Sequence, residues 1–384
     1  MPTDFQDIDW SAQQHSRQQF RISRTTNYQS YRNHTFTQDI YSKYDPSLNI
    51  LGFRKFIPTK IFGAHFQLRN LIHCTSQYDV FYSTDQGVFH YHSLSQSTNH
   101  VINSTIKVST MQAKNNFVCL GGFNSDFIYK RINISQPVET KLKLSLEPDA
   151  IINHVDVIDN TAIVSCNDVS IKYLDLETKH VDCFKTEYAV NCTATRNYST
   201  VMAGDCNSCD IFDKNREKIV TLVGHADHIF SCDWKDDHVI ATGSQDMSIR
   251  LWDIRYPKYS FSCIKSRIGA FRCLKYSPNG RFLAATEQAD FMYVFDTNTI
   301  ENVENKEEMF PFYDMINLPV PIWACSGNDF IDHPEKVLDI DSPIKCQVID
   351  FFGDCAGVCW SIDGDSLYCG NMDEGYGGIM EFSV

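Results

Sequence analysis

The chain has 384 residues, of which 43% are hydrophobic and 13% aromatic, so it is not disordered throughout and can form a sizeable core. At about 150 residues per domain, this length by itself predicts two or three domains. The formal net charge of −14 argues against general affinity for nucleic acid or anionic membranes, because attraction to phosphate dominates such binding.

The first 33 residues are predicted to form an N-terminal arm that is partly helical or irregular. Arg17, Arg21, Arg24 and Arg32 lie there among Gln, Ser and Tyr, with Trp10 before them. We expect this basic arm to dock on the acidic side of the protein's own body, with Trp10 as an anchor. The alternatives are a flexible arm that binds a partner protein and an arm that contacts RNA. The chain shows no signal-peptide or membrane-spanning pattern, so we expect a cytoplasmic or nuclear protein that is not secreted.

An internal repeat follows the arm. Short, alternating, β-branched runs recur around turn acids that precede an aromatic or apolar residue; these acids are Asp85, Asp126, Asp168, Asp205, Asp246, Asp290 and Asp373. Successive acids are separated by 41, 42, 37, 41, 44 and 83 residues. A step of about 40–45 residues is typical of a unit of four β-strands. Helical periodicity is nearly absent, so the repeat predicts an all-β fold.

The clearest copy of the repeat is residues 222–255, LVGHADHIFSCDWKDDHVIATGSQDMSIRLWDIR. Its Gly-His, its Ala-Thr-Gly-Ser run, its turn acid and its Trp-Asp pair resemble a WD repeat, in which each unit forms one four-stranded blade of a β-propeller. The resemblance implies that His225, Thr242, Asp246 and Trp252 form a hydrogen-bonded structural tetrad that ties the strands together and sets their register. We therefore interpret these side chains as structural and predict no catalytic residue.

The repeats predict a single seven-bladed WD-repeat β-propeller over residues 34–384. The step of 83 residues contains the segment 300–343, which has five prolines and several acids but no turn followed by Trp-Asp. We interpret this segment as an insertion within the sixth blade, before a returning fourth strand at 346–352; a degenerate eighth blade is the alternative. About three strands fit after Phe352. The missing outer strand is therefore expected from TFTQDIY or LNILGFRKFIP near the N-terminus, which would close the ring and remove a sheet edge.

Four segments resemble an uncharacterised group of WD-repeat proteins from fungi, plants and amoebae. They are DIDWSAQQHSRQQFRISRTTNYQSY (7–31), HFQLRNLIHCTSQYDVFY (65–82), IGAFRCLKYSPNGRFLAATEQADFMYVFD (268–296) and IDFFGDCAGVCWSIDGDSLYCGNMDEGYGGIMEF (349–382). The insertion departs from the pattern of this group. The resemblance supports the fold and implies no biochemical activity.

The sequence Trp252-Asp253-Ile254-Arg255 is a WD-x-Arg motif. It resembles the signature of propellers that serve as substrate receptors of cullin-type ubiquitin ligases, where the planar guanidinium reaches an adaptor carboxylate or carbonyl. The resemblance implies partner-binding roles for Trp252, Asp253 and Arg255. Many propellers carry the same motif without binding a ligase, and in that case Arg255 would pair with a neighbouring acid.

The chain contains no Walker A loop, dinucleotide fingerprint, Gly-x-Ser-x-Gly or His-Glu-x-x-His sequence. Its only Cys-x-x-C, at Cys206 and Cys209, has no second pair nearby, and His90 and His92 lack a third ligand. We therefore predict a non-enzymatic scaffold, without metal or cofactor, that mediates protein–protein interactions. Its partners are expected to be proteins rather than membranes or nucleic acid. The alternative function is a cullin-ligase substrate receptor that contacts its adaptor through Arg255.

Overall fold

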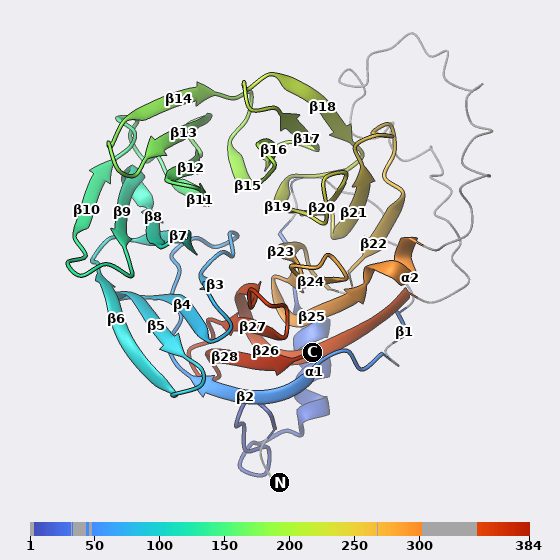
Figure 1. Ribbon diagram of the computed structural model, residues 1–384. Helices are drawn as coiled ribbons and strands as arrows, with labels where there is room; N and C mark the ends of the chain where they lie inside the picture. The colour runs from blue at the N-terminus through green and yellow to red at the C-terminus, as the bar shows by residue number, and fades with distance from the viewer. Residues whose placement is uncertain (1–3, 32, 34–43, 46–47, 267, 302–343) are drawn as a thin grey trace, which may run out of the picture.

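The computed structural model describes residues 4–31, 33, 44–45, 48–266, 268–301 and 344–384. These residues form seven four-stranded antiparallel blades arranged in a ring, with an arm at the N-terminus (Figure 1). The predicted all-β, seven-bladed propeller fold is therefore confirmed. The division into an arm of residues 1–33 and a propeller of residues 34–384 stays a prediction, because parts of both lie outside the described residues.

The first five blades are meanders in chain order, and their first strands lie innermost and contact one another around the ring. Blade one comprises β3 (Ile72–Cys74), β4 (Asp79–Thr84), β5 (Gly87–His92) and β6 (Ser97–Asn103). Blade two comprises β7 (Val108–Lys114), β8 (Phe117–Gly122), the 3-10 turn η1 (Phe123–Ser125), β9 (Asp126–Arg131) and β10 (Glu139–Lys143). Blade three comprises β11 (Ile152–Ile158), β12 (Thr161–Cys166), β13 (Ser170–Asp175) and β14 (Val181–Lys185). Blade four comprises β15 (Val190–Arg196), β16 (Ser199–Gly204), β17 (Ser208–Phe212) and β18 (Lys218–Val223). Blade five comprises β19 (Ile229–Trp234), β20 (Val239–Ser244), β21 (Ser248–Asp253) and β22 (Ser262–Lys265).

Blades six and seven share one long strand. Blade six comprises β23 (Phe271–Tyr276), β24 (Phe282–Glu287), β25 (Ala289–Asp296) and the first part of β26 (Ile344–Trp360). The last part of β26 pairs with β27 (Ser366–Asn371), which pairs with β28 (Gly378–Ser383). The helix α2 (Thr297–Glu301) follows β25, and a short β1 (Tyr44–Asp45) pairs in parallel with β26. The chain between β25 and β26 includes the segment interpreted as an insertion, and its residues 302–343 lie outside the described residues.

An N-terminal strand completes the last blade. β2 (Gly52–Pro58) pairs antiparallel with β28, with Ile57 opposite Ile379. This strand falls within LNILGFRKFIP, which confirms that the N-terminal region supplies the outer strand, whereas TFTQDIY lies outside the described residues. The hydrogen-bonded pairing joins the two ends of the chain, so the ring is closed by backbone contacts.

The hydrophobic core lies between adjacent blades rather than at one centre. The inner three strands of the blades are mostly buried, whereas outer strands such as β14 and β18 are largely exposed. One core cluster joins blades seven, one and two and includes Ile379, Ile72, Val80, Met111 and Val118. Because each blade needs its neighbours to bury its two faces, the described residues form one ring and not the two or three domains that the length alone predicts.

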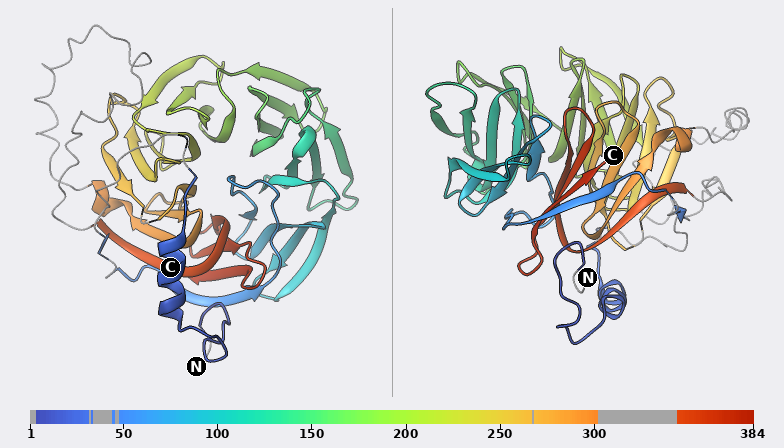
Figure 2. Two further views of the ribbon diagram at one scale, coloured as in Figure 1. Left: turned by 180° about the vertical axis from the view of Figure 1, so that it is seen from behind. Right: turned by 60° about the horizontal axis from the view of Figure 1, so that its bottom comes forward.

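The blades have two distinct faces. We call upper the face with the turns between second and third strands and the connections between blades, and lower the face with the other turns. Helix α1 (Arg17–Asn27) lies in front of the ring when the protein is viewed from behind (Figure 2, left). Its first turn is set by a capping box, in which Ser16 and Gln19 bond each other's backbone N–H groups. The contacts of α1 with the β24–β25 turn place the arm on the upper face.

Candidate functional site

The four residues predicted to form the tetrad are brought together in blade five. His225 precedes β19, Thr242 lies on β20, Asp246 lies in the β20–β21 turn and Trp252 lies on β21. The Nδ1 atom of His225 is 2.9 Å from the Asp246 carboxylate, and its Nε2 atom is 2.7 Å from the Thr242 hydroxyl. The Trp252 indole N–H donates to the same hydroxyl at 2.9 Å. All four side chains are buried, so they connect the strands and present nothing to a ligand.

The electrostatics of the tetrad fit a neutral histidine beside an ionised acid. Burial lowers the pKa of His225, although the Asp246 carboxylate acts in the opposite direction. Burial acts to raise the pKa of Asp246, but His225 and the Ser248 hydroxyl outweigh it and hold that pKa below its ordinary value. With Asp246 ionised, Nδ1 of His225 donates to the carboxylate and Nε2 accepts from Thr242.

The turn acid recurs in other blades with different partners. Asp168 of blade three is 2.7 Å from the Lys172 ammonium, and Asp205 of blade four is 3.3 Å from a ring nitrogen of His228. Asp290 of blade six is fully buried and binds arginines from the arm. The repeat therefore preserves the acid, while its partner differs from blade to blade.

Three arginines hold the arm to blade six. Arg24 makes a two-point contact with Asp290, with Nε–Oδ2 and Nη2–Oδ1 distances of 2.7 Å each. Arg21 bonds the same carboxylate at 2.7 Å and also contacts Asp350, and Arg17 lies 3.1 Å from Asp350. Spacings of four and three residues place these side chains on one face of α1. The contacts confirm that the arm docks on acidic groups of the protein's own body; Arg32 lies outside the described residues.

An aromatic cluster adds to these ion pairs. The rings of Trp10 and Phe20 each lie 5.1 Å from the ring of Phe352, between centroids. The Arg21 guanidinium lies 4.2 Å from the same ring, at a distance suited to a cation–π contact. Trp10 therefore anchors the arm, as its sequence position predicts.

Beyond α1, the arm continues across the upper face toward blade five (Figure 2). The Tyr28 ring packs against Gly269, where an added Cβ would lie 3.2 Å from it. Asn33 then donates from its backbone and side chain to Asp227 at 3.0 and 2.9 Å. Tyr28 thus contacts the connection that leads into blade six, and Asn33 contacts the connection that leads into blade five.

The connection before blade one reaches the same region. Gln67 donates to the side-chain oxygen of Gln245 in the β20–β21 turn at 3.3 Å, although blades one and five are not neighbours. Arg69 donates to the carbonyls of His65, Phe66 and Leu68 at 2.9–3.0 Å and so curls this connection around its own guanidinium. Residues 65–69 therefore lie over the centre of the ring on the upper face.

The residue at the β-bulge of the innermost strand differs between blades three, four, five and six. Asn153 and Asn191 lie at β-bulges in blades three and four, and each donates to a carbonyl of the next blade, Val190 and Ile229, at 3.0 and 3.2 Å. The same bulge holds Phe230 in blade five and Arg272 in blade six, where the guanidinium lies 4.0 Å from the Phe230 ring. A cation–π contact replaces the amide–carbonyl bond there.

No motif or repeat position in the sequence marks Arg69 or Arg272 as a candidate site residue. The signal available was an arginine inside each of two largely apolar runs, LRNLIHC and IGAFRCLKY. Charged residues are rarely buried without a partner, so this pattern indicates an unusual environment.

Aromatic side chains gather on the upper face near the ring centre. Phe66 and Tyr31 are 65% and 57% exposed, and their rings meet edge to face at 6.5 Å. The His65 ring stacks on the Phe66 ring at 5.3 Å and lies 6.4 Å from the Phe123 ring, between centroids. The Lys107 ammonium lies 4.2 Å from the centre of the Phe123 ring. We call Tyr31, His65, Phe66 and Phe123 the aromatic patch. Burial, together with the charge of Arg69, lowers the pKa of His65 to about 4, so its ring is neutral near pH 7.

The WD-x-Arg motif lies at the opposite face. Arg255 follows β21, is exposed, and pairs with Asp253 through two nitrogens, with an Nη2–Oδ2 distance of 2.6 Å and an Nε–Oδ1 distance of 2.9 Å. Trp252 is buried in the tetrad, so only Asp253 and Arg255 of the three candidate partner-binding residues reach the surface. The arrangement matches the interpretation in which Arg255 pairs with a neighbouring acid.

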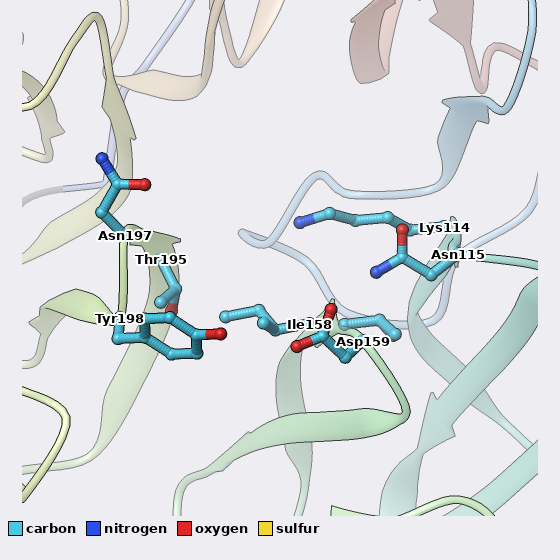
Figure 3. A pocket seen from close by; sticks show the side chains of 8 residues that line it. Lys114, Asn115, Ile158, Asp159, Thr195, Asn197 and Tyr198 are labelled. Atoms are coloured by element: carbon cyan, nitrogen blue, oxygen red, sulfur yellow. The ribbon is translucent and has the colours of Figure 1, made fainter.

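A pocket of about 270 Å³ also opens on the lower face (Figure 3). It is lined by turn residues of blades two, three and four, namely Lys114, Asn115, Val157, Ile158, Asp159, Thr195, Asn197 and Tyr198. Lys114 already pairs with Asp156 at 2.8 Å, and Asn197 bonds Asp237 at 2.8 Å. Because these polar groups are bonded to other residues, the pocket offers little to orient a ligand.

Within the described part of the chain, no three His, Cys, Asp or Glu side chains gather in a way that could hold a metal ion. The cysteines described there, Cys206 and Cys209 included, are free thiols. Neither helix of the described residues combines the length and apolar character needed to cross a membrane.

Comparisons with known proteins agree with this architecture. Residues 216–253 match the family "WD domain, G-beta repeat". The chain is 23% identical over 178 residues to the APC/C activator protein CDH1 of Saccharomyces cerevisiae, covering 44% of this chain and 30% of that protein. It is 32% identical over 144 residues to eukaryotic translation initiation factor 3 subunit I of Debaryomyces hansenii, covering 34% of this chain and 40% of that protein. The chain thus spans less than half the length of these relatives.

Two solved structures share the fold across most of their length. A chain in the crystal structure of the mitotic checkpoint complex aligns with a TM-score of 0.64 at 13% identity, covering 92% of this chain and 99% of that one. The WD40 β-propeller domain of Doa1 aligns with a TM-score of 0.62 at 15% identity, covering 87% of this chain and 97% of that one. The ring of blades, the repeat match and these relatives together identify the chain as a WD-repeat β-propeller protein.

Proposed function

We propose that this protein is a non-enzymatic scaffold that binds protein partners through the aromatic patch on its upper face. The observation that carries the proposal is the exposure of Phe66 and Tyr31 beside the ring centre. Aromatic side chains on a rigid support bury large areas at low entropic cost and dominate many protein interfaces. The blades supply that support for His65, Phe66 and Phe123, which lie on connections of the β-sheets, whereas Tyr31 lies on the docked arm.

The relatives support a role in protein assembly. One is named as an activator of the APC/C and another as a subunit of translation initiation factor 3. The non-enzymatic part of the proposal is supported by the tetrad, whose His, Asp and Thr are buried and bonded to one another. The free thiols support the proposed cytoplasmic or nuclear location, since such compartments keep cysteines reduced.

Affinity capture of the tagged full-length chain from cells that express it tests the proposal. Proteins retained by the wild type are expected to be lost with Phe66→Ala, because truncation removes the most exposed ring of the patch. The control is Tyr256→Ala, which removes an exposed aromatic ring on the lower face and should keep the same partners. Equal retention by wild type and Phe66→Ala would show that the patch is not the docking surface.

The ligase-receptor alternative remains a prediction that rests on the exposure of Arg255 at the lower face. Its pairing with Asp253 gives the guanidinium a partner inside the chain, which favours the scaffold without a ligase. A pull-down of cullin adaptors with wild type and Arg255→Ala tests it. Adaptor binding that Arg255→Ala abolishes would support the receptor, whereas no adaptor with the wild type would end this alternative.

A further inference from the structure

Two thiol groups meet where blades one and seven adjoin. Cys74 ends β3 and Cys359 lies in the last part of β26, and these innermost strands lie side by side (Figure 1). Their Sγ atoms are 3.2 Å apart, although the two residues are 285 positions apart in the sequence. The contact is therefore a product of the closed ring and not of a local turn.

The two strands hold these thiols in register. The Leu71 backbone N–H donates to the Ala356 carbonyl at 3.1 Å, which fixes the start of β3 against β26. Cys74 and Cys359 each lie three residues further along, and both strands run from the upper to the lower face as the first strands of their blades. Because the offsets are equal, a small rotation of each side chain brings the sulfur atoms to the bonding distance of about 2.05 Å.

The two thiols differ in exposure. Cys74 is partly exposed, whereas Cys359 is 6% exposed within the core cluster that joins blades seven, one and two. Burial and the adjacent Cys74 thiol raise the pKa of Cys359, so this group is protonated near neutral pH. A dissolved oxidant therefore reaches Cys74 first, and Cys359 is positioned to react with the product.

A second pair of neighbouring thiols shows the contrast. Cys192 of blade four and Cys232 of blade five each donate to the other's backbone carbonyl at 3.8 Å. Both side chains are buried, so a dissolved oxidant has no access to either. At Cys74 and Cys359, by comparison, a direct sulfur–sulfur contact occurs together with solvent access to one of the two thiols.

We propose that Cys74 and Cys359 form a disulfide bond when hydrogen peroxide reaches the protein, and that this bond links blade one covalently to blade seven. Peroxide oxidises Cys74 first: a sulfur–oxygen bond forms, the oxygen–oxygen bond breaks, and the released hydroxide leaves with the thiol proton as water. Cys359 then attacks that sulfur. The sulfur–sulfur bond forms, the sulfur–oxygen bond breaks, and the second hydroxide leaves with the Cys359 proton as water. Two thiols and one peroxide thus give one disulfide and two waters.

This bond lies beside the seam at which the ring closes. In blade seven, β2 from the N-terminal region pairs with β28 from the other end of the chain through backbone hydrogen bonds. The bond between Cys74 and Cys359 encloses blades one to six in a single covalent loop, so blades one and seven stay joined even if β2 separates from β28. A long enclosed loop also restricts the unfolded chain, which stabilises the folded ring.

Peroxide treatment of the full-length protein tests the site. The protein is reduced with dithiothreitol, freed of it, exposed to hydrogen peroxide and then treated with iodoacetamide to block the remaining thiols. Peptide mass spectrometry without reduction is expected to show Cys74 linked to Cys359, and to show no such link before peroxide. Cys183 is exposed on β14, so its oxidation reports that the dose was sufficient. Oxidised Cys183 together with unlinked Cys74 would overturn the inference.

Single substitutions separate this pair from general thiol oxidation. Cys74→Ser changes a partly exposed side chain and should fold as the wild type does, but it should leave Cys359 reduced and unlinked. Cys183→Ser is the matched control, because it removes an exposed thiol and should keep the link between Cys74 and Cys359. Cys359→Ala is the second test and should stop the oxidation of Cys74 before a disulfide forms.

The melting temperature tests the effect on the ring. Oxidised wild type should melt about 3–8 °C higher than the same sample after dithiothreitol, as expected for a disulfide that encloses a long loop. The comparison uses one sample because dithiothreitol reduces the disulfide and leaves oxidised methionine unchanged. Cys74→Ser should show no difference. Equal melting temperatures for linked and reduced wild type would contradict the stabilising effect of the link.

Discussion

The Thr242 hydroxyl serves two buried nitrogen groups at once. It is bonded to Nε2 of His225 at 2.7 Å and accepts from the Trp252 indole at 2.9 Å. Both contacts lie inside blade five, where no solvent can replace them. The tetrad thus stabilises blade five, and two of its hydrogen bonds depend on the single hydroxyl oxygen of Thr242.

Replacement of this oxygen should destabilise the protein. Thr242→Val keeps the shape of the side chain but leaves a buried imidazole nitrogen and a buried indole N–H unsatisfied, which costs about 2–4 kcal/mol in the free energy of unfolding. Urea unfolding followed by tryptophan fluorescence measures the change. Ser83→Ala is the control, since the buried Ser83 hydroxyl has no partner and its removal should change stability little. A Thr242→Val protein as stable as the wild type would show that these hydrogen bonds do not stabilise the fold.

At the scale of elements, two features keep the ring closed. β2 pairs with β28, and the long strand β26 pairs with both β25 and β27 and so joins blades six and seven. β2 joins the last blade across more than 300 positions of sequence, so its pairing is a tertiary contact rather than a local hairpin. Gly378 starts β28 and lies opposite Pro58 of β2. A Cβ there would lie 2.6 Å from the Ile57 carbonyl and from the Phe56 ring.

Gly378→Ala is therefore expected to weaken closure. The added methyl group forces β2 away from β28 and should cost about 1–3 kcal/mol, with a lower melting temperature and a greater tendency to self-associate through the freed edge. Differential scanning calorimetry and light scattering measure both effects. Gly375→Ala in the preceding turn is the matched control, because its Cβ would come no nearer than 3.5 Å to its surroundings. Equal melting temperatures for the two variants would contradict the predicted strain.

At the scale of the whole molecule, the ring buries neutral histidines in several blades. Burial lowers the pKa of His73 in blade one and of His225 in blade five, and lowers that of His65 on the upper face to about 4. In the unfolded chain each would titrate near 6.5. His228 is the opposite case, because its bond to Asp205 raises its pKa.

The protein should therefore lose stability as the pH falls from about 7 to 5. In that window the three histidines His73, His225 and His65 bind protons in the unfolded chain but stay neutral in the folded protein. Proton uptake therefore favours the unfolded state. The stabilising contribution of His228 is retained at low pH and lost as pH rises, but it is outnumbered. Acids with lowered pKa, such as Asp246, remain ionised in this range. Melting temperatures measured at constant ionic strength between pH 8 and pH 5 test this, and a constant or rising value toward pH 5 would contradict it.

The sequence by itself determined the repeat, the all-β fold, seven blades and a closing N-terminal strand. These features depend on periodicity, turn chemistry and the need to remove sheet edges, which are all local or arithmetic properties of a chain. The tetrad residues could also be named in advance, because one repeat carries the whole pattern.

Only the tertiary structure decided which partner each polar group meets. Asp290 looked like another turn acid, yet its counter-ions come from Arg21 and Arg24, more than 260 positions away. The convergence of Arg69 with Arg272, and of Tyr31 with Phe66, likewise joins segments from different blades and the arm. Such contacts depend on how the closed ring brings distant connections to one centre, and no single repeat contains that information.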